Sequence, residues 1–329
     1  MSLHALMRGL LDSNAFAHKR DIQPMLAGLA GLDSGALPLG DDSAALRDGD
    51  GHLLIAIEGF INEFVAAEPA FAGYCGVMVN VSDIYAMGGR PLAVVDALWS
   101  DGPEHAGAIL GGLREAAEKY RVPVVGGHSN ARTDRPQLAV AILGRARALL
   151  TSFDANPGDS LITVYDPRGR YRPVADNWDA SSEAPAERLR GDLEILPMLA
   201  EQGLCRAAKD ISMAGVVGTT LMLLEASGVG AVLDLDALPR PAGVPLERWL
   251  RTFPSYGFVL SVAPAHRAAV LRAFHERNLA AAEVGTVTAS GRFELSLNGK
   301  RGLFWDLRRQ PFIGSTPRSQ SLCAIHQGG

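Results

Sequence analysis

The sequence predicts an α/β protein with two domains. Its 329 residues are enough for about two hydrophobic cores of ordinary size. Hydrophobic residues make up 47% of the chain and charged residues 20%, a balance typical of an α/β enzyme. Over the first half, strand and helix patterns follow the order β-β-α-β-α-β, which predicts a sheet with helices packed on one side.

The N-terminal part predicts a helical segment followed by a hairpin. Residues 4–31 have helical periodicity with a break near residues 21–24. The stretch LPLGDDSAAL, residues 37–46, leads into a strand, and the Asp-Gly repeat at residues 48–51 predicts a turn. Residues 52–58, HLLIAIE, form the returning strand of that hairpin.

The stretch FAGYCGVMVNVSDIYAMGGRP, residues 71–91, predicts a buried helix. Its residues are apolar nearly all round, and Asn80, Asp83 and Met87 share one face by their spacing. A carboxylate on such a helix requires a partner, a metal ion or a cleft, because burying an unpaired charge is costly. Gly88 and the following glycine and proline predict its end.

The rest of the first domain contains a glycine pair after a predicted strand. Residues 92–99 predict a strand, and residues 105–120 an amphipathic helix. Residues 122–125 predict a short buried strand that runs into the loop Gly126-Gly127-His128-Ser129. Two glycines allow backbone N–H groups to approach a phosphate closely. Residues 137–143 predict the last strand of this domain.

The second half repeats the mixture of strands and helices after a boundary near residues 150–159. We expect domains at 1–153 and 154–307, and an extended tail at 308–329. Asp210 precedes Ser212, the predicted N-cap of an apolar helix at 213–226. A loop with three alternating arginines predicts either a solvated surface or a grip on a phosphate or carboxylate; these are Arg168, Arg170 and Arg172. The stretch SLITVYDPRGRYRP, residues 160–173, predicts a strand followed by the arginine loop. The remaining predicted elements are a helix at 187–202, strands at 229–235, 257–262, 281–288 and 291–299, a short helix from Trp249 and a helix at 264–278.

Composition excludes several classes of function. A net charge of −5 and a pI near 5.9 argue against a nucleic-acid partner, since no run of lysines and arginines compensates locally. The cysteines at 75, 205 and 323 are far apart and lack CxxC spacing, which indicates reduced thiols in a cytoplasmic protein. The first residues lack the pattern of a signal peptide, and no apolar stretch is long enough for a membrane span.

Carboxylates stand at the edges of apolar elements, which points to a magnesium site. They are Asp41, Asp42, Glu58, Asp83 and Asp210. Oxygen ligands without a Cys/His cluster suit Mg²⁺, which is usually held by a few carboxylates together with substrate phosphates. Neither a Walker A loop nor a dinucleotide-binding glycine pattern occurs, so this suggests ATP chemistry without a P-loop.

These motifs together resemble the AIR synthase-related superfamily. GDDSAAL, VNVSDIYAMGGRP, VVGGHS, KDISMAGVVG and YGFVLSV occur in the order found there, over about residues 37–300. The superfamily includes phosphoribosylformylglycinamidine cyclo-ligase, selenide, water dikinase and thiamine-monophosphate kinase. The resemblance implies an N-terminal domain whose sheet pairs with a second subunit, a C-terminal α/β domain, and ATP with Mg²⁺ in a cleft. A homodimer with a small-molecule substrate is therefore expected.

The resemblance also assigns expected site residues. Asp42, Asp83 and Asp210 match metal-binding aspartates of the family, and Glu58 stands where related patterns have an aspartate. The expected nucleotide contacts are Asp41, Asn80, Gly126, Gly127, His128 and Ser129. His128 and Lys19 are the candidate catalytic side chains, with Lys19 in a small basic cluster that could contact phosphate.

The chain departs from the family patterns at points that affect chemistry. GGHS stands where thiamine-monophosphate kinases have GGDT, DISMAG stands in place of DISDG, and no cysteine precedes Cys75. The resemblance thus implies a distinct branch that transfers the γ-phosphoryl group of ATP to a small acceptor. Two alternatives remain open: an AIR synthase-like cyclo-ligase, and a non-catalytic nucleotide-binding subunit of a biosynthetic complex.

Overall fold

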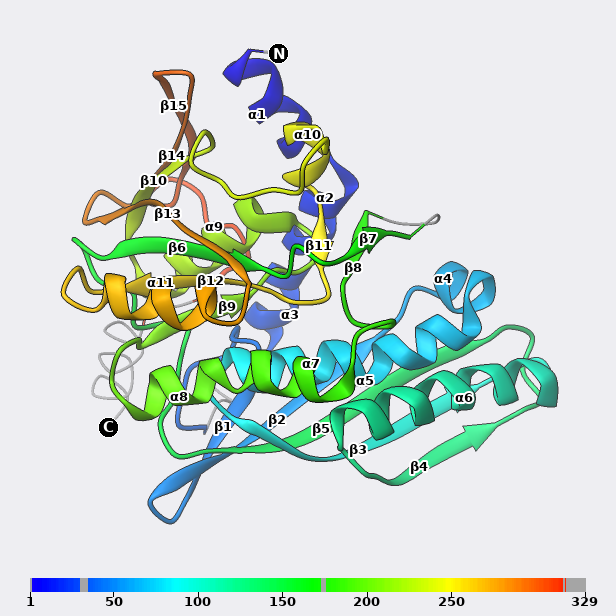
Figure 1. The fold of residues 1–329 in the computed structure, drawn as a ribbon. Helices are drawn as coiled ribbons and strands as arrows, with labels where there is room; N and C mark the ends of the chain where they lie inside the picture. Colours follow the sequence, from blue (N-terminus) through cyan, green and yellow to red (C-terminus); the bar gives the residue numbers. More distant parts are fainter. Residues whose placement is uncertain (1, 30–34, 173–175, 316, 318–329) are drawn as a thin grey trace. The chain divides into compact units, whose positions relative to one another are not determined.

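The computed structural model describes residues 2–29, 35–172, 176–315 and 317, and it divides the chain into two compact units (Figure 1). Unit 1 comprises Met1–Asp42, Leu150–Ala180 and Leu199–Gly329, and unit 2 comprises Ser43–Leu149 and Ser181–Met198. Both units are mixed α/β, as predicted. No helix of the described part is long and apolar enough to cross a membrane.

Unit 2 is built on a five-stranded sheet with the order β1-β2-β5-β3-β4. Its strands are β1 (Ala44–Asp48), β2 (Gly51–Gly59), β3 (Arg90–Trp99), β4 (Val124–Asn130) and β5 (Gln137–Ala146). The predicted hairpin is confirmed, with β1 and β2 antiparallel from the Ala44/Ile55 pair to the Asp48/Gly51 pair. The edge strand β4 pairs parallel with β3, while the other neighbours in this sheet are antiparallel.

Helices cover one face of this sheet. They include α4 (Asn62–Ala67), α5 (Pro69–Ala86) and α6 (Pro103–Tyr120), and α7 (Ala186–Leu193) packs beside α6 (Figure 1). The predicted buried helix is α5, in which 15 of 18 residues are buried. Gly88 takes a φ of 73° just beyond its end, the left-handed conformation expected of a C-terminal glycine.

Two glycines let α5 and α6 approach each other more closely than larger residues allow. A Cβ atom on Gly73 of α5 would lie 1.9 Å from the carbonyl oxygen of Ile109. A Cβ atom on Gly112 of α6 would lie 1.7 Å from the carbonyl oxygen of Ala70. Since real Cβ atoms do not come this near to backbone oxygens, the contact between the helices depends on glycine at both positions.

Unit 1 contains a seven-stranded sheet with the order β15-β14-β10-β13-β6-β12-β9. Its strands are β6 (Ser160–Tyr165), β9 (Ala207–Asp210), β10 (Gly230–Asp234), β12 (Gly257–Val262), β13 (Ala280–Thr288), β14 (Arg292–Leu297) and β15 (Lys300–Asp306). A small second sheet contains β7 (Arg170–Tyr171), β8 (Asn177–Asp179) and β11 (Phe253–Pro254). The helices are α1 (Leu3–Leu11), α2 (Asn14–Arg20), α3 (Ile22–Gly28), α9 (Gly215–Ser227), α10 (Leu246–Trp249) and α11 (Arg267–His275), and α8 (Ile195–Glu201) crosses from unit 2 into unit 1.

The units differ from the predicted division because both ends of the described chain pack into unit 1. Phe16 of α2 is 2% exposed, and its ring centroid lies 5.5 Å from that of Phe312 and 5.6 Å from that of Phe304. Glu225 of α9 accepts hydrogen bonds from the backbone N–H groups of Phe312, at 2.6 Å, and Ile313, at 2.8 Å. The first part of the predicted tail is therefore fixed in the core, while Cys323 and residues 318–329 lie outside the described residues.

Several local predictions are corrected. Ser212 is not the N-cap of α9, because the helix begins at Gly215 and its N-cap position is Ala214. Residues 126–129 do not form a loop after a buried strand, since they belong to β4, which is exposed along its length. The N-terminal helical segment has two breaks rather than the single predicted one, because residues 3–28 form three short helices.

Candidate functional site

A buried polar cluster in unit 1 gathers around the segment that ends at Asp42. It contains Asp41, Asp42, Ser152 and Lys209, whose side chains come from three separate parts of the sequence. The turn into this cluster uses Gly40 with a φ of 110°, a conformation that side chains with a Cβ atom rarely adopt. Strand β9 pairs antiparallel with β12 and carries Lys209 and Asp210 at its end.

Asp41 is held by Ser152 rather than by solvent. Its Oδ2 accepts a hydrogen bond from the Ser152 backbone N–H at 2.8 Å, and its Oδ1 accepts one from the Ser152 hydroxyl at 2.5 Å. Burial raises the pKa of Asp41 to about 6 against the opposing effect of the Lys209 charge, and the nearby Asp42 charge raises it further. The Asp41 side chain is 1% exposed, so it lies in the interior of unit 1.

Lys209 supplies the positive charge of the cluster. Its ammonium group donates a hydrogen bond to Asp42 Oδ1 and lies 3.9 Å from Asp41 Oδ1. Burial by itself would lower the pKa of Lys209, but the charges of Asp42 and Asp41 outweigh it and leave that pKa above its usual value. The lysine therefore stays protonated, and each buried charge has a partner.

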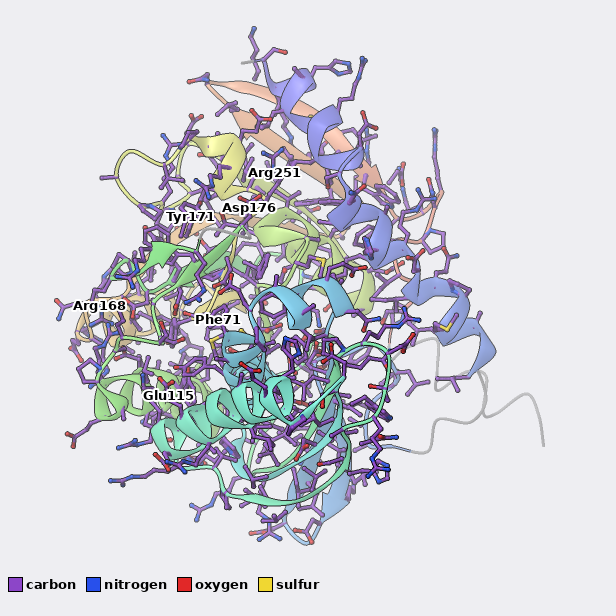
Figure 2. The ribbon with its side chains drawn as sticks, turned by 90° about the vertical axis from the view of Figure 1, so that its right-hand side faces the viewer. Phe71, Glu115, Arg168, Tyr171, Asp176 and Arg251 are labelled. Carbon is purple, nitrogen blue, oxygen red and sulfur yellow. The ribbon has the colours of Figure 1, made fainter. Side chains whose placement is uncertain are left out.

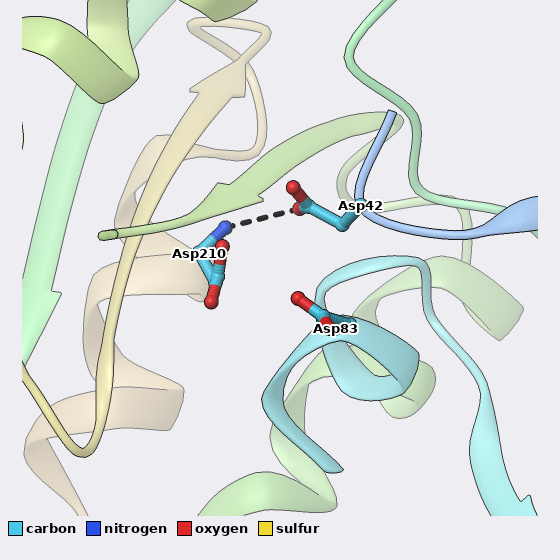
Figure 3. A group of neighbouring side chains, drawn as sticks. All are labelled: Asp42, Asp83 and Asp210. Atoms are coloured by element: carbon cyan, nitrogen blue, oxygen red, sulfur yellow. Dashed lines mark hydrogen bonds between the residues drawn. The ribbon is translucent and has the colours of Figure 1, made fainter. Parts of the chain in front are cut away.

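Asp42 and Asp210 form the part of the cluster with the chemistry of a metal site. Figure 3 shows the hydrogen bond from the Asp210 backbone N–H to Asp42 Oδ2, which measures 3.2 Å. The two carboxylates each offer an oxygen within 4.8 Å of the other. By type these donors fit a hard divalent cation such as Mg²⁺. Asp42 Oδ1 faces the Lys209 ammonium group, whose like charge disfavours a metal ion at that oxygen, so a metal ion is favoured at Oδ2.

Two predicted residues lie on α5 of unit 2. Asp83, labelled in Figure 3, is 5% exposed. Asn80, one turn earlier, is fully buried, and its side-chain amide donates hydrogen bonds to the carbonyl oxygens of Gly76, at 2.7 Å, and Val140, at 2.9 Å. Asn80 thus ties α5 to the sheet through its amide nitrogen, and its predicted contact with a nucleotide stays a prediction.

The predicted phosphate loop lies on the edge strand β4. A Cβ atom on Gly127 would lie 2.4 Å from Asp96 Oδ1 on β3, so packing explains this glycine. His128 is exposed and lies next to Trp99, with 6.4 Å between the ring centroids. Glu58 lies near the end of β2 in the same sheet. The prediction that residues 126–129 contact a nucleotide stays a prediction, as does the prediction that Glu58 binds a metal ion.

Arg168 and Arg172, in the predicted arginine loop, have local partners. Arg168 donates to Asp166 Oδ1 at 2.6 Å, and the charged groups of Arg172 and Asp179 lie 3.5 Å apart. Figure 2 labels Arg168 and also Tyr171, which belongs to β7. Arg172 thus supports the small sheet through Asp179, and binding of a phosphate or carboxylate by this loop stays a prediction. Lys19 lies in the last turn of α2.

Sequence reasoning missed Ser152 and Lys209. Ser152 is fully buried, yet it lies at a predicted domain boundary where polar residues are ordinary. Lys209 had a signal, because it interrupts the otherwise apolar start of a short strand, Ala207-Ala208, directly before a predicted metal ligand. A lysine at such a position is rarely buried without a paired carboxylate.

Comparisons with known proteins match both halves of the chain. A model of the AIR synthase related protein N-terminal domain matches residues 40–146, and one of the corresponding C-terminal domain matches residues 174–298. An uncharacterized protein of Synechocystis sp. is 48% identical over 305 residues, covering 91% of this chain and 94% of the relative. A selenide, water dikinase of Aeromonas hydrophila is 27% identical over 264 residues, covering 70% and 72%.

Solved structures share the fold. PurL of Thermotoga maritima, complexed with ADP, matches with a TM-score of 0.73 and 20% identity over 93% of this chain. This chain spans 52% of that PurL structure. AaThiL complexed with AMPPCP and TMP matches with a TM-score of 0.60 and 20% identity, covering 81% of this chain and 92% of that structure.

Proposed function

This chain is an AIR synthase related protein, and from that premise we propose that it binds ATP with Mg²⁺ and transfers the γ-phosphoryl group to a small-molecule acceptor. The observation that carries this proposal is the carboxylate pair Asp42 and Asp210, which has the oxygen donors that Mg²⁺ prefers. Support comes from a relative that is a selenide, water dikinase and from a structural neighbour complexed with AMPPCP.

The proposed roles follow from the chemistry of each side chain. Asp42, Glu58, Asp83 and Asp210 are the proposed ligands, through which Mg²⁺ would neutralise charge on the phosphates. The backbone of residues 126–129 is proposed to face the phosphates, with Asp41 fixing the segment that carries Asp42. Positioning of the reactants would supply most of the rate, because phosphoryl transfer needs little covalent help from the protein.

The direct test is ATP turnover against a panel of small acceptors, followed by ³¹P NMR and ADP release. Asp210→Asn and Asp83→Asn are expected to abolish Mg²⁺-dependent turnover. Asp50→Asn, in the exposed turn between β1 and β2, is the matched control and should keep wild-type turnover. Unchanged turnover and Mg²⁺-dependent ATP binding in both site variants contradicts the proposed metal ligands.

A second candidate function is a nucleotide-binding subunit without turnover. It is favoured by Lys209, which engages one oxygen of the proposed ligand Asp42. Tight ATP binding with no ADP release for any acceptor supports this candidate. ATP hydrolysis coupled to ring closure, without a phosphorylated product, indicates the cyclo-ligase instead.

We propose a homodimer because the face of the unit 2 sheet opposite its helices exposes apolar side chains. Alternation along β2 places Leu54 and Ala56 in the core and turns Ile55 and Ile57 outward, where they are 43% and 68% exposed. The outward residues of the neighbouring strands continue this apolar face: Leu46 of β1, Leu143 of β5 and Val95 of β3. A contiguous apolar surface of this kind is typical of an interface, and we propose a second copy of this chain as its partner.

A further inference from the structure

The side chain of Lys209 is a buried positive charge beside the proposed metal ligands. It is 6% exposed, at the end of β9 between Ala208 and Asp210. Lysine is almost never fully buried unless it is paired, because its ammonium group loses hydration in the interior. The position of this charge is therefore set by the oxygens around it.

Those oxygens form a set that a hard cation would accept. Lys209 donates to Asp42 Oδ1, and its Nζ atom lies 3.5 Å from the Ser152 hydroxyl and 3.9 Å from Asp41 Oδ1. The set is also fixed in place, because Ser152 donates twice to Asp41 and the Asp42 backbone N–H donates to Asp41 Oδ1 at 2.9 Å. Two carboxylates and a hydroxyl are oxygen donors of the kind that bind Mg²⁺ or Mn²⁺.

We propose that Lys209 acts as a built-in cation that excludes one divalent ion from the Asp41–Asp42 pair and so sets how many metal ions the site binds. This inference rests on the proposed function, which places a metal ion at Asp42 and Asp210. Lys209 holds the Oδ1 side of Asp42, and the ion of the proposed function is left with the Oδ2 side and the Asp210 carboxylate.

The lysine also fixes the direction of Asp42. With Oδ1 bound to Lys209 and Oδ2 accepting from the Asp210 N–H, the Asp42 carboxylate has one orientation. A carboxylate oxygen can accept more than one partner, so Oδ2 remains able to bind metal. Lys209 is thus a positioning residue, and unlike a metal ion it cannot be lost to solvent or to a chelator.

A purely structural ion pair predicts a different result from a built-in cation. Removing a structural lysine leaves unpaired buried carboxylates and destabilises the fold, with no gain in affinity for metal. Removing a built-in cation opens a set of oxygens to a divalent ion. The number of ions bound per chain separates these two roles, whereas stability alone does not.

The test is a Mn²⁺ titration of the nucleotide-free full chain, with free Mn²⁺ measured by electron paramagnetic resonance. Lys209→Met should bind one more Mn²⁺ per chain than the wild type. The double variant Lys209→Met/Asp41→Asn removes one charge of each sign, so it keeps the net charge of the cluster; because the amide at position 41 keeps a carbonyl oxygen as a donor, this variant should also gain an ion. Lys300→Met, which removes an exposed lysine on β15 of the same unit, should bind as the wild type does.

Folding of each variant is followed by circular dichroism with and without Mn²⁺. A variant that folds only when Mn²⁺ is added supports the inference, because the ion then replaces the lost ammonium charge. An unchanged number of bound ions in both Lys209 variants overturns it. Failure of both variants to fold even in millimolar Mn²⁺ also overturns it, because oxygens able to bind the ion would be stabilised by it.

The outcome is distinguishable from a failure of the proposed function. If wild-type protein binds ATP with Mg²⁺ but Lys209→Met gains no ion, only the role of Lys209 is wrong. If Lys209→Met gains an ion while the wild type binds no nucleotide, the built-in cation stands and the proposed function fails.

Discussion

Because α5 and α6 are in close contact, alanine substitutions at two adjacent glycines of α6 should change the free energy of unfolding in opposite directions. Gly112 faces α5, where an added Cβ atom would lie 1.7 Å from the Ala70 carbonyl oxygen and 2.9 Å from the Tyr74 amide nitrogen. Gly111 has no atom within 4 Å of the same position. Gly111→Ala is therefore a matched control, because both substitutions add one methyl group and the same gain in helix propensity.

The magnitudes follow from these two contributions. Replacing an exposed helical glycine with alanine stabilises by ~1 kcal/mol, so Gly111→Ala should raise the free energy of unfolding by this amount. Overpacking against neighbours costs about 1–3 kcal/mol, and the upper end applies at Gly112 because the atoms opposing the methyl are backbone and cannot rotate away. Gly112→Ala should then lose about 2 kcal/mol after the propensity gain.

The two variants should differ by about 3 kcal/mol in the free energy of unfolding, as measured by urea denaturation with circular dichroism. Hydrogen exchange of the α5 and α6 amides assigns the change to unit 2, because that unit holds both helices. Equal effects of Gly111→Ala and Gly112→Ala refute the close contact of the two helices. A stabilising Gly112→Ala refutes it as well.

Three further predictions concern the exposed sheet face, the buried acid and the buried thiols. Ile57→Asp should dissociate the proposed homodimer in light scattering, while Leu303→Asp, at an exposed leucine on β15 of unit 1, should leave it intact; a dimeric Ile57→Asp contradicts the interface. Because burial raises the pKa of Asp41 from 3.8 to about 6, the folded protein holds this proton more tightly than the unfolded chain. The free energy of unfolding of the wild type, relative to that of Asp41→Asn, should therefore rise by ~1 kcal/mol between about pH 7 and about pH 5 in urea titrations. A fall in this difference would contradict a raised pKa of Asp41. Burial raises the pKa of Cys205 to about 12, so its peptide and that of the buried Cys75 should stay unmodified when the native protein is treated with iodoacetamide; labelling at the rate of denatured protein contradicts their burial.

Local sequence patterns were sufficient to predict the elements whose structure depends on neighbours in the sequence. Helix α5 follows from apolar residues all round and from the glycines that end it, and the β1–β2 hairpin follows from its Asp-Gly turn. The family motifs directed attention to Asp42 and Asp210, which the structure brings together within unit 1. These features require no knowledge of distant contacts.

Features that depend on distant partners were missed or misplaced. Lys209 and Asp42 are separated by 167 positions, and no periodicity predicts that they meet. The glycines of β4 argue locally against a strand, but pairing with β3 overrides that preference. The anchoring of Phe312 was also missed, because the polar residues around it resemble a frayed end and its partner Glu225 lies 87 positions earlier.

The backbone N–H groups of residues 312–314 donate hydrogen bonds to the Glu225 carboxylate, and this late-synthesised contact affects the order in which the chain folds. Phe16 is made about 300 residues before Phe312, yet its ring packs on Phe312. The sheet of unit 2, by contrast, is complete by Ala146. Translation therefore completes the sheet of unit 2 before the core of unit 1 receives Phe312 and Ile313. A ribosome stalled before Pro311 should hold an unfinished unit 1 whose N-terminal helices expose their apolar faces to chaperones.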